Sequence, residues 1–173
     1  MISCFTRVHV DDVGSAELKL VLRVWNEIAG GGSHVEFTDV EQQFWRNPVL
    51  LGPRSMVLMA DETNPDDPRA WMLTRSGGSF PVAGGHLPIG CRLGDLPDAA
   101  YVAAASAALA EALAAGVATF HRYTGVVGGT RIQYERIALP MYHEGRPDAL
   151  CTVAAGYRIE GVAAPILLRT EAR

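Results

Sequence analysis

Residues 117–160 read VATFHRYTGVVGGTRIQYERIALPMYHEGRPDALCTVAAGYRIE, and this stretch decides the fold. Its pattern predicts three consecutive antiparallel strands, at 118–127, 130–142 and 149–159. The Gly128-Gly129 pair supplies the positive φ that a tight hairpin needs, and residues 143–148 are rich in turn-forming types. Sequential hairpins form a meander, and a meander must bury at least one face.

The middle predicted strand carries apolar residues at both parities. Ile132 and Tyr134 point to one side of the sheet, whereas Ile137, Leu139 and Met141 point to the other. Either a bulge shifts the phase or both faces of the sheet are covered. The third strand has two such sets as well, Leu150 and Ala154 against Val153, Tyr157 and Ile159. This repetition favours two covered faces, so we expect the rest of the chain to supply a lid for each.

Composition limits the functional classes open to this chain. Its 173 residues, 49% hydrophobic and 20% charged, are typical of one folded domain with a sizeable core. A net charge of −4 provides no basic surface for nucleic acid. No apolar run reaches the roughly 18 residues of a membrane helix, and the N-terminus lacks the pattern of a secretory signal. We therefore expect a cytoplasmic protein that binds neither nucleic acid nor membrane.

The cysteines indicate neither a disulfide framework nor a metal site. Cys4, Cys91 and Cys151 are odd in number and far apart, and no metal-type spacing joins them. We interpret them as buried thiols in a reducing compartment and predict no bound metal.

The most regular helical pattern lies near the N-terminus. Ser15 is a suitable N-cap, and three glycines at 30–32 end the predicted helix over 15–29. Its apolar stripe consists of Leu18, Val21, Leu22, Trp25 and Ile28. We expect this stripe to pack on one face of the sheet, on the matching helix of a second chain, or on both. Packing on the matching helix of a second chain corresponds to the homodimer that we expect.

The rest of the chain supplies a second hairpin and a second lid. Strands are predicted at 55–60 and 69–75, which brings the sheet to five antiparallel strands. A Gly- and Pro-rich connecting region at 76–97 precedes an alanine-rich helix at 98–115. Three segments complete the predicted organisation: an N-terminal arm or short strand at 1–14, a single domain at 15–160 whose part at 33–54 stays undecided, and a tail at 161–173.

This order of elements resembles the PAS domain superfamily, and in particular the stand-alone PAS-like proteins of alphaproteobacteria. The similarity extends over roughly residues 15–160. The segments that carry it are LKLVLRVWNEIAGGG (18–32), PVAGGHLPIGCRLGDLP (81–97) and LPMYHEGRPDALCTVAAGY (139–157). The resemblance implies an α+β fold: a five-stranded antiparallel sheet, connecting helices on one face, and an N-terminal amphipathic helix on the other face or in a dimer.

The resemblance also implies a sensory or signalling module without its own output domain. Such a module binds a small apolar ligand, a partner such as a sensor kinase, or both. Candidates for the pocket are Met59, Met72, Phe80, His86, Cys91, Leu93, Tyr101, Ile137 and Val153. The alternatives are a protein-interaction or dimerisation adaptor with a filled core, and a small enzyme.

PAS relatives can hold haem through a histidine, or flavin through a reactive cysteine, in the connecting region. Cys91 lacks the Asn-Cys-Arg-Phe-Leu-Gln-like context of a flavin site, whereas a haem on His86 stays open as a minor possibility. We predict no cofactor.

Polar residues alternate along two of the predicted strands. His121 and Tyr123 share one parity, as do Arg131, Gln133 and Glu135, and we interpret both sets as the less buried side of a strand. The sequence contains no nucleophile elbow, phosphate loop or His-Glu-x-x-His motif, so we predict that the protein is not an enzyme.

Overall fold

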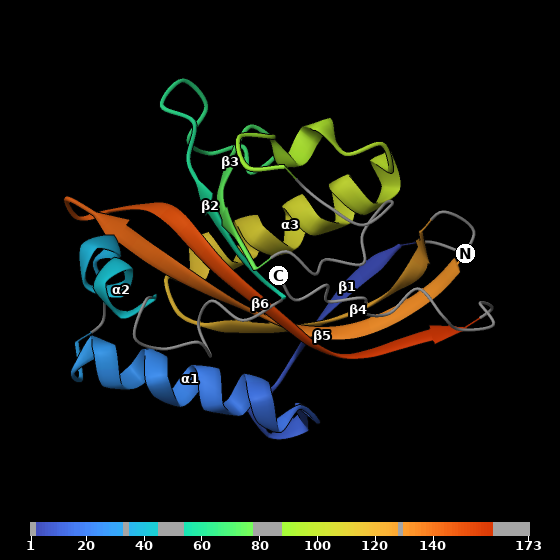
Figure 1. Ribbon diagram of the computed structural model, residues 1–173, viewed down its shortest axis with the longest axis horizontal. Helices are drawn as coiled ribbons and strands as arrows, with labels where there is room; N and C mark the ends of the chain where they lie inside the picture. The colour runs from blue at the N-terminus through green and yellow to red at the C-terminus, as the bar shows by residue number, and fades with distance from the viewer. Residues whose placement is uncertain (1–2, 33–34, 45–53, 78–87, 128–129, 161–173) are drawn as a thin grey trace, which may run out of the picture.

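The computed structural model describes residues 3–32, 35–44, 54–77, 88–127 and 130–160. These residues form an α+β fold in which an antiparallel sheet lies between two helical layers (Figure 1). Its strands are β1 (Cys4–Val8), β2 (Ser55–Met59), β3 (Met72–Ser76), β4 (Thr119–Val127), β5 (Thr130–His143) and β6 (Arg146–Glu160).

The strands are arranged in the order β1-β4-β5-β6-β2-β3. Consecutive hairpins join β4, β5 and β6, and β2 pairs with β6, with Ser55 opposite Val153. The prediction that the first hairpin lies beside the last strands is therefore confirmed. All pairings among these strands are antiparallel.

The sheet has one strand more than the five predicted. The sixth is β1, from the segment predicted to be an N-terminal arm or a short strand, and it pairs with β4 so that Phe5 lies opposite Tyr123. Without β1, one edge of β4 would present a row of unpaired backbone groups. The folded unit thus begins before residue 15, because backbone pairing draws part of the arm into the sheet.

The helices cover opposite faces of this sheet. In Figure 1, α3 (Ala99–Ala115) lies on one side, and α1 (Ala16–Ala29) and α2 (Phe37–Phe44) lie on the other. Short 3-10 helices, η1 (Val10–Asp12) and η2 (Leu93–Asp95), precede α1 and α3. No helix in the described part of the chain is long and apolar enough to cross a membrane.

Side-chain caps set the ends of the two longer helices. Ser15 Oγ accepts a hydrogen bond from the Leu18 N–H at 3.3 Å, and Asp98 accepts one from the Tyr101 N–H at 2.9 Å. Gly30 and Gly116 end the helices in the left-handed region, with φ of 57° and 64°. Local sequence signals therefore determine where α1 and α3 begin and end.

Each face of the sheet has its own hydrophobic core, as the two parities of the middle strand predict. Ile132 and Tyr134 belong to the core beneath α3, and Ile137 and Leu139 belong to the core beneath α1. The stripe of α1 packs in this second core: Leu18, Val21 and Trp25 are buried, and Leu22 and Ile28 are partly buried. The chain's own sheet thus covers the stripe, and its burial does not require a second chain.

A bulge in β6 changes which face its end presents. Gln133 pairs with Arg158 and Glu135 pairs with Ala155, so Tyr134 faces two residues of β6, Gly156 and Tyr157. Gly156 has a φ of 67°. Simple parity predicts that Tyr157 packs with Val153. The extra residue reverses the alternation, so Tyr157 packs instead in the core beneath α3.

Candidate functional site

Aromatic side chains form a row across the sheet beneath α3. Phe5 lies opposite Tyr123, and Tyr123 lies opposite Tyr134, with ring centroids 4.9 Å apart in both pairs. Tyr157 continues the row, 4.9 Å from Tyr134. Tyr101 of α3 covers it from above, with its ring centroid 5.4 Å from that of Tyr123. The strand register therefore gathers five rings from four strands and one helix.

The neighbouring row of the same face is basic. Arg7 lies opposite His121, and His121 lies opposite Arg136. Glu111 of α3 contacts the first two members, since it accepts a hydrogen bond from Arg7 Nη1 at 2.9 Å and lies 3.3 Å from His121 Nε2. Within the described residues, no carboxylate forms an ion pair with the third member, Arg136. The aromatic row, the basic row and Tyr101 together form what we call the tyrosine–arginine cluster: Phe5, Arg7, Tyr101, His121, Tyr123, Tyr134, Arg136 and Tyr157.

Arg136 is the least compensated member of the cluster. It is only 1% exposed, and its Nε and Nη2 atoms have no hydrogen-bond partner among the residues that the structure describes. Its guanidinium carbon lies 4.1 Å from the centre of the Phe5 ring. A desolvated cation–π contact contributes about 2 kcal/mol, whereas burying a cation costs several kcal/mol. The Phe5 ring therefore offsets only part of the cost.

The surrounding tyrosines do not supply the missing negative charge. Burial raises the pKa of Tyr101, Tyr134 and Tyr157, so all three phenols are neutral near pH 7. Tyr101 and Tyr134 share a hydrogen bond of 3.1 Å between their hydroxyls, and Tyr157 Oη has no partner within the described part of the chain. Burial also lowers the pKa of Arg136, but a guanidinium stays protonated in proteins. Among the residues that the structure describes, the interior beneath α3 thus carries a positive charge that no carboxylate compensates.

His121 is neutral and oriented by Glu111. Burial, followed by the charge of Arg136, lowers its pKa from 6.5 to about 4, against the opposing effect of Glu111. Burial raises the pKa of Glu111, but its hydrogen bonds to His121 and Arg7 outweigh this and lower it overall. An ionised Glu111 can only accept, so His121 Nε2 carries the proton and donates it. His121 Nδ1 is then an acceptor, buried and without a partner among the described residues.

A glycine makes room for one of the rings. A Cβ built on Gly125 of β4 would collide with the Tyr123 hydroxyl and would lie 2.9 Å from Ser3 Oγ. These two groups share a hydrogen bond of 3.2 Å. Gly125 therefore allows the Tyr123 ring to lie flat along its own strand.

Of the nine residues predicted to line a pocket, the seven that the structure describes do not converge. Leu93 and Tyr101 lie in the core beneath α3, whereas Ile137 and Val153 lie in the core beneath α1, on the opposite face of the sheet. These four cannot line one pocket, because alternate side chains of a strand point to opposite faces. Met59 and Cys91 are half-buried, and Met72 is 41% exposed. Phe80 and His86 lie outside the described residues.

Two open hollows lie on the surface. One, of about 510 Å³, is lined by Arg7, Val8, His9, Val10, Leu22, Ala118, Thr119 and Phe120. The other, of about 490 Å³, is lined by Arg69, Gly94, Leu96, Ala99, Val102, Ala103 and Ser106. None of the seven predicted pocket residues that the structure describes lines either hollow.

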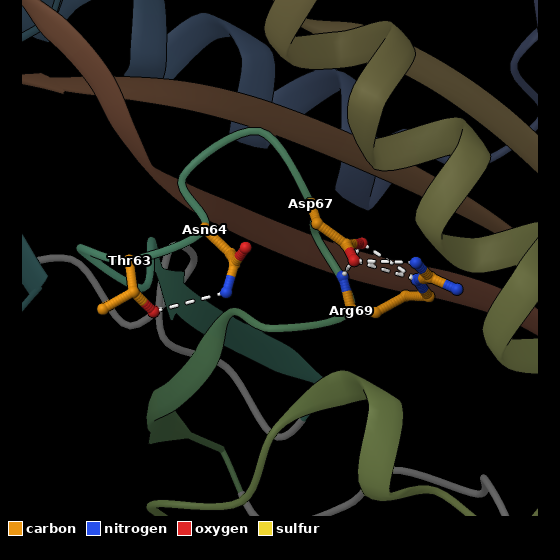
Figure 2. A network of polar contacts seen from close by, with 4 residues as sticks. All are labelled: Thr63, Asn64, Asp67 and Arg69. Carbon is orange, nitrogen blue, oxygen red and sulfur yellow. Dashed lines mark hydrogen bonds and ion pairs between the residues drawn. The ribbon is translucent and has the colours of Figure 1, made fainter.

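One residue of the β2–β3 loop, Arg69, lines the second hollow. Figure 2 shows Arg69 turned onto Asp67, with Arg69 Nη2 2.8 Å from Asp67 Oδ2 and Arg69 Nε 2.9 Å from Asp67 Oδ1. In the same loop, Asn64 Nδ2 donates to Thr63 Oγ1 at 3.3 Å. The carboxylate of Asp67 already neutralises Arg69, in contrast to the buried Arg136.

Two predictions about polar residues need correction. His121 and Tyr123 were expected on a less buried side of their strand, yet both side chains are fully buried, because α3 covers that face. Of the three cysteines expected to be buried, only Cys151 is; Cys91 is half-buried and Cys4 is exposed at the sheet edge. Burial raises the pKa of Cys91, and it raises that of Cys151 to about 12. Both of these thiols are therefore protonated and weakly nucleophilic near neutral pH.

Over the described ranges, no three His, Cys, Asp or Glu side chains lie close enough together to hold a metal ion.

Arg136 was not among the site residues predicted from the sequence. One signal for it exists in the sequence: Arg136 has the same parity as Ile132 and Tyr134, which were expected to face a covered side of the sheet. A lone arginine on an apolar face indicates either an ion pair or a ligand. Only the structure shows that, within the described residues, no carboxylate forms an ion pair with Arg136.

Comparison of this chain with protein-family models, with curated proteins and with solved structures finds no match.

Proposed function

We propose that this protein is a PAS-like sensory module that binds a small molecule between α3 and the sheet and transmits its presence to a partner protein. The PAS-like part of the proposal is supported by the arrangement of the strands. The β2–β3 hairpin lies beside β6, and α3, which connects the two groups of strands in the chain, covers one face of the sheet. The pocket residues expected from sequence do not support it, since they lie on two faces.

The observation that carries the ligand-binding part is the uncompensated Arg136. Buried polar groups in proteins are almost always hydrogen-bonded, and a buried charge is almost always paired. Here two nitrogens of one guanidinium lack partners in the described part of the chain, at a position 1% exposed. A bound anion resolves both deficits. The sequence-based expectation of an apolar ligand is therefore replaced by a ligand that carries a negative charge.

The same elements offer a route for a signal. Tyr101 and Glu111 both belong to α3, and both contact the sheet through polar side chains. A ligand that binds better to one position of α3 shifts the population towards that position by its differential affinity. Glu111 also bonds Arg7 on the edge strand β1, so a movement of α3 reaches an exposed edge of the sheet. We propose a second copy of the chain or a signalling protein such as a sensor kinase as the recipient.

A second candidate function is a protein-interaction adaptor with a filled core. It is supported by the hydrophobic core on each face of the sheet and by the absence of the described predicted pocket residues from the two hollows. In this case Arg136 is a structural cation held by the Phe5 ring, and no small molecule enters the cluster.

Native mass spectrometry of protein purified from its own host distinguishes the two functions. For the sensor we expect a mass excess that disappears under denaturing conditions and is lost in Arg136→Met. Arg131→Met is the matched control, because Arg131 lies on the same strand but is 43% exposed and bonds Glu160. The adaptor predicts the bare chain mass for the wild type and both variants, together with a melting temperature that no small anion raises.

A further inference from the structure

We propose that the ligand is a small monocarboxylate held by the Nε–Nη2 edge of Arg136, an inference that rests on the proposed function. The two unpartnered nitrogens, Nε and Nη2, are the ones that share an edge of the planar guanidinium. Their N–H bonds point in parallel, at the spacing of the two oxygens of a carboxylate. The unpartnered N–H donors of Arg136 thus have the geometry that binds a carboxylate through two parallel hydrogen bonds.

The charge of the cluster selects a monoanion. Arg136 contributes one positive charge, and the neighbouring phenols are neutral because burial raises their pKa. Glu111 is already bonded to Arg7 and His121. A carboxylate therefore balances the site, whereas a phosphate monoester carries about −1.5 to −2 charges and leaves part of its charge unpaired in a buried site.

The surroundings of Arg136 favour an apolar body on this carboxylate. Phe5 lies against the guanidinium, and the rings of Tyr101 and Tyr134 lie within 6.0 Å of Phe5 by their centroids. The face of α3 turned to the sheet includes three buried alanines, Ala105, Ala108 and Ala112. Small side chains make few van der Waals contacts. A ligand that displaces α3 therefore breaks fewer contacts at these alanines than it would if large side chains stood there. Sodium benzoate, with one carboxylate and one ring, is a suitable probe, and sodium acetate tests the carboxylate alone.

Binding has a second consequence at His121. The positive charge of Arg136 is one of the influences that lower the pKa of His121, along with burial and Arg7, while Glu111 opposes them. A carboxylate on Arg136 cancels the first of these charges. Occupancy of the site therefore raises the pKa of His121. Because Arg7 also acts on this pKa, the response locates the anion beside Arg136 only if it is lost in Arg136→Met.

The experiment compares the wild type with Arg136→Met, Arg136→Lys and Arg131→Met in sodium benzoate, acetate and phosphate at matched ionic strength. Benzoate is expected to raise the melting temperature of the wild type and of Arg131→Met by several degrees, acetate less, and phosphate no more than chloride. Arg136→Met should melt no lower than the wild type without benzoate and show no benzoate effect, since it removes an unpaired buried charge. Arg136→Lys, which keeps the charge but loses the bidentate edge, should bind benzoate about tenfold more weakly. Imidazole NMR should show the titration of His121 moving upward with benzoate in the wild type and not in Arg136→Met.

Four results would overturn the assignment. Equal stabilisation of the wild type and Arg136→Met by benzoate places the anion elsewhere, and equal stabilisation by phosphate rejects the monocarboxylate class. A host-derived molecule that depends on Arg136 but competes with no carboxylate leaves the sensor function standing and removes only its ligand class. The sensor function and its carboxylate ligand are both rejected if three results occur together: the native mass is that of the bare chain, no probe changes the melting temperature, and Arg136→Met is less stable than the wild type. Arg136 is then a structural cation.

Discussion

Tyr157 stacks on Tyr134, with ring centroids 4.9 Å apart and ring planes inclined by 29°. Simple alternation along β6 places Tyr157 on the opposite face, together with Val153. The bulge at Gly156 corrects the direction, because two residues of β6 face the single residue Tyr134 of β5. One backbone irregularity therefore completes the aromatic row of the tyrosine–arginine cluster.

Replacing Gly156 with alanine should destabilise the protein through its backbone. Gly156 has a φ of 67°, and a Cβ at this position meets no atom within 4 Å, so the effect is conformational and not steric. The left-handed conformation costs an L-residue about 1–2 kcal/mol, and we expect Gly156→Ala to lower the free energy of unfolding by that amount. Gly156→Asn is the control, since asparagine tolerates this region and should lose clearly less. Urea denaturation measures both, and equal losses in the two variants would contradict the explanation.

Truncating Trp25 should weaken the fold without changing the oligomeric state. Trp25 is 6% exposed and packs with Ile137 and Leu139 in the core beneath α1. Trp25→Ala is expected to cost about 3–5 kcal/mol, as for other large buried aromatics. Leu20→Ala, on the same helix but at a residue that is 41% exposed, should change the stability by no more than about 0.5 kcal/mol.

Sedimentation of the wild type and Trp25→Ala tests the homodimer separately. A wild type that stays monomeric at high concentration removes the proposed dimer. A dimer that dissociates in Trp25→Ala while the melting temperature is unchanged would show that the stripe of α1 covers a second chain and not its own sheet.

Removing the carboxylate of Glu135 should loosen the start of α1. Its oxygens accept hydrogen bonds from the Gly14 N–H at 3.2 Å and the Ser15 N–H at 2.9 Å, and they pair with Arg122 Nη2 at 2.9 Å. Glu135→Ala leaves these donors without their partner and should cost about 1–2 kcal/mol. The exposed carboxylate of Glu160 is the control, and Glu160→Ala should be nearly neutral.

The same carboxylate makes a pH-dependent contribution. Burial raises the pKa of Glu135, but its hydrogen bonds from Arg122, Gly14 and Ser15 outweigh this and lower it below 4.5. Because the folded pKa is depressed, the stabilisation is present above pH 4.5 and is lost as the pH falls below it. A Glu135→Ala penalty that does not shrink under acid conditions would contradict this account.

The buried His121 should lower the free energy of unfolding at less acidic pH than Glu135 does. Its folded pKa of about 4 lies below the ordinary 6.5, so the unfolded chain takes up the proton first as the pH falls. The contribution of neutral His121 is therefore complete above pH 6.5 and is lost between pH 6.5 and about 4, with a slope of up to about 1.4 kcal/mol per pH unit. His121→Gln should flatten the stability curve in this window. Glu111→Gln, which removes the charge that raises the pKa of His121, should extend the loss to lower pH; identical curves for all three proteins would exclude His121 as the cause.

Local patterns in the sequence determined much of the architecture. Alternation along 130–142 predicted that both faces of the sheet are covered, and the structure has a core on each. The caps at Ser15 and Gly30 predicted the ends of α1 because they are satisfied by residues within one turn of the helix. Such features depend on neighbours in the chain, so a sequence contains nearly all the information that sets them.

The candidate site depended on contacts that no local pattern contains. Phe5 and Arg7 reach the cluster only because β1 pairs with β4, more than a hundred residues away, and Tyr157 reaches it only through the bulge at Gly156. That no described residue pairs with Arg136 Nε and Nη2 likewise depends on the groups around this side chain in space. The sequence by itself determined five of the described strands, the two longer helices, and that both faces of the sheet are buried. Register and packing between distant segments decided which side chains share the space beneath α3, because a charge is compensated or not by its neighbours in space and not by its neighbours in the chain.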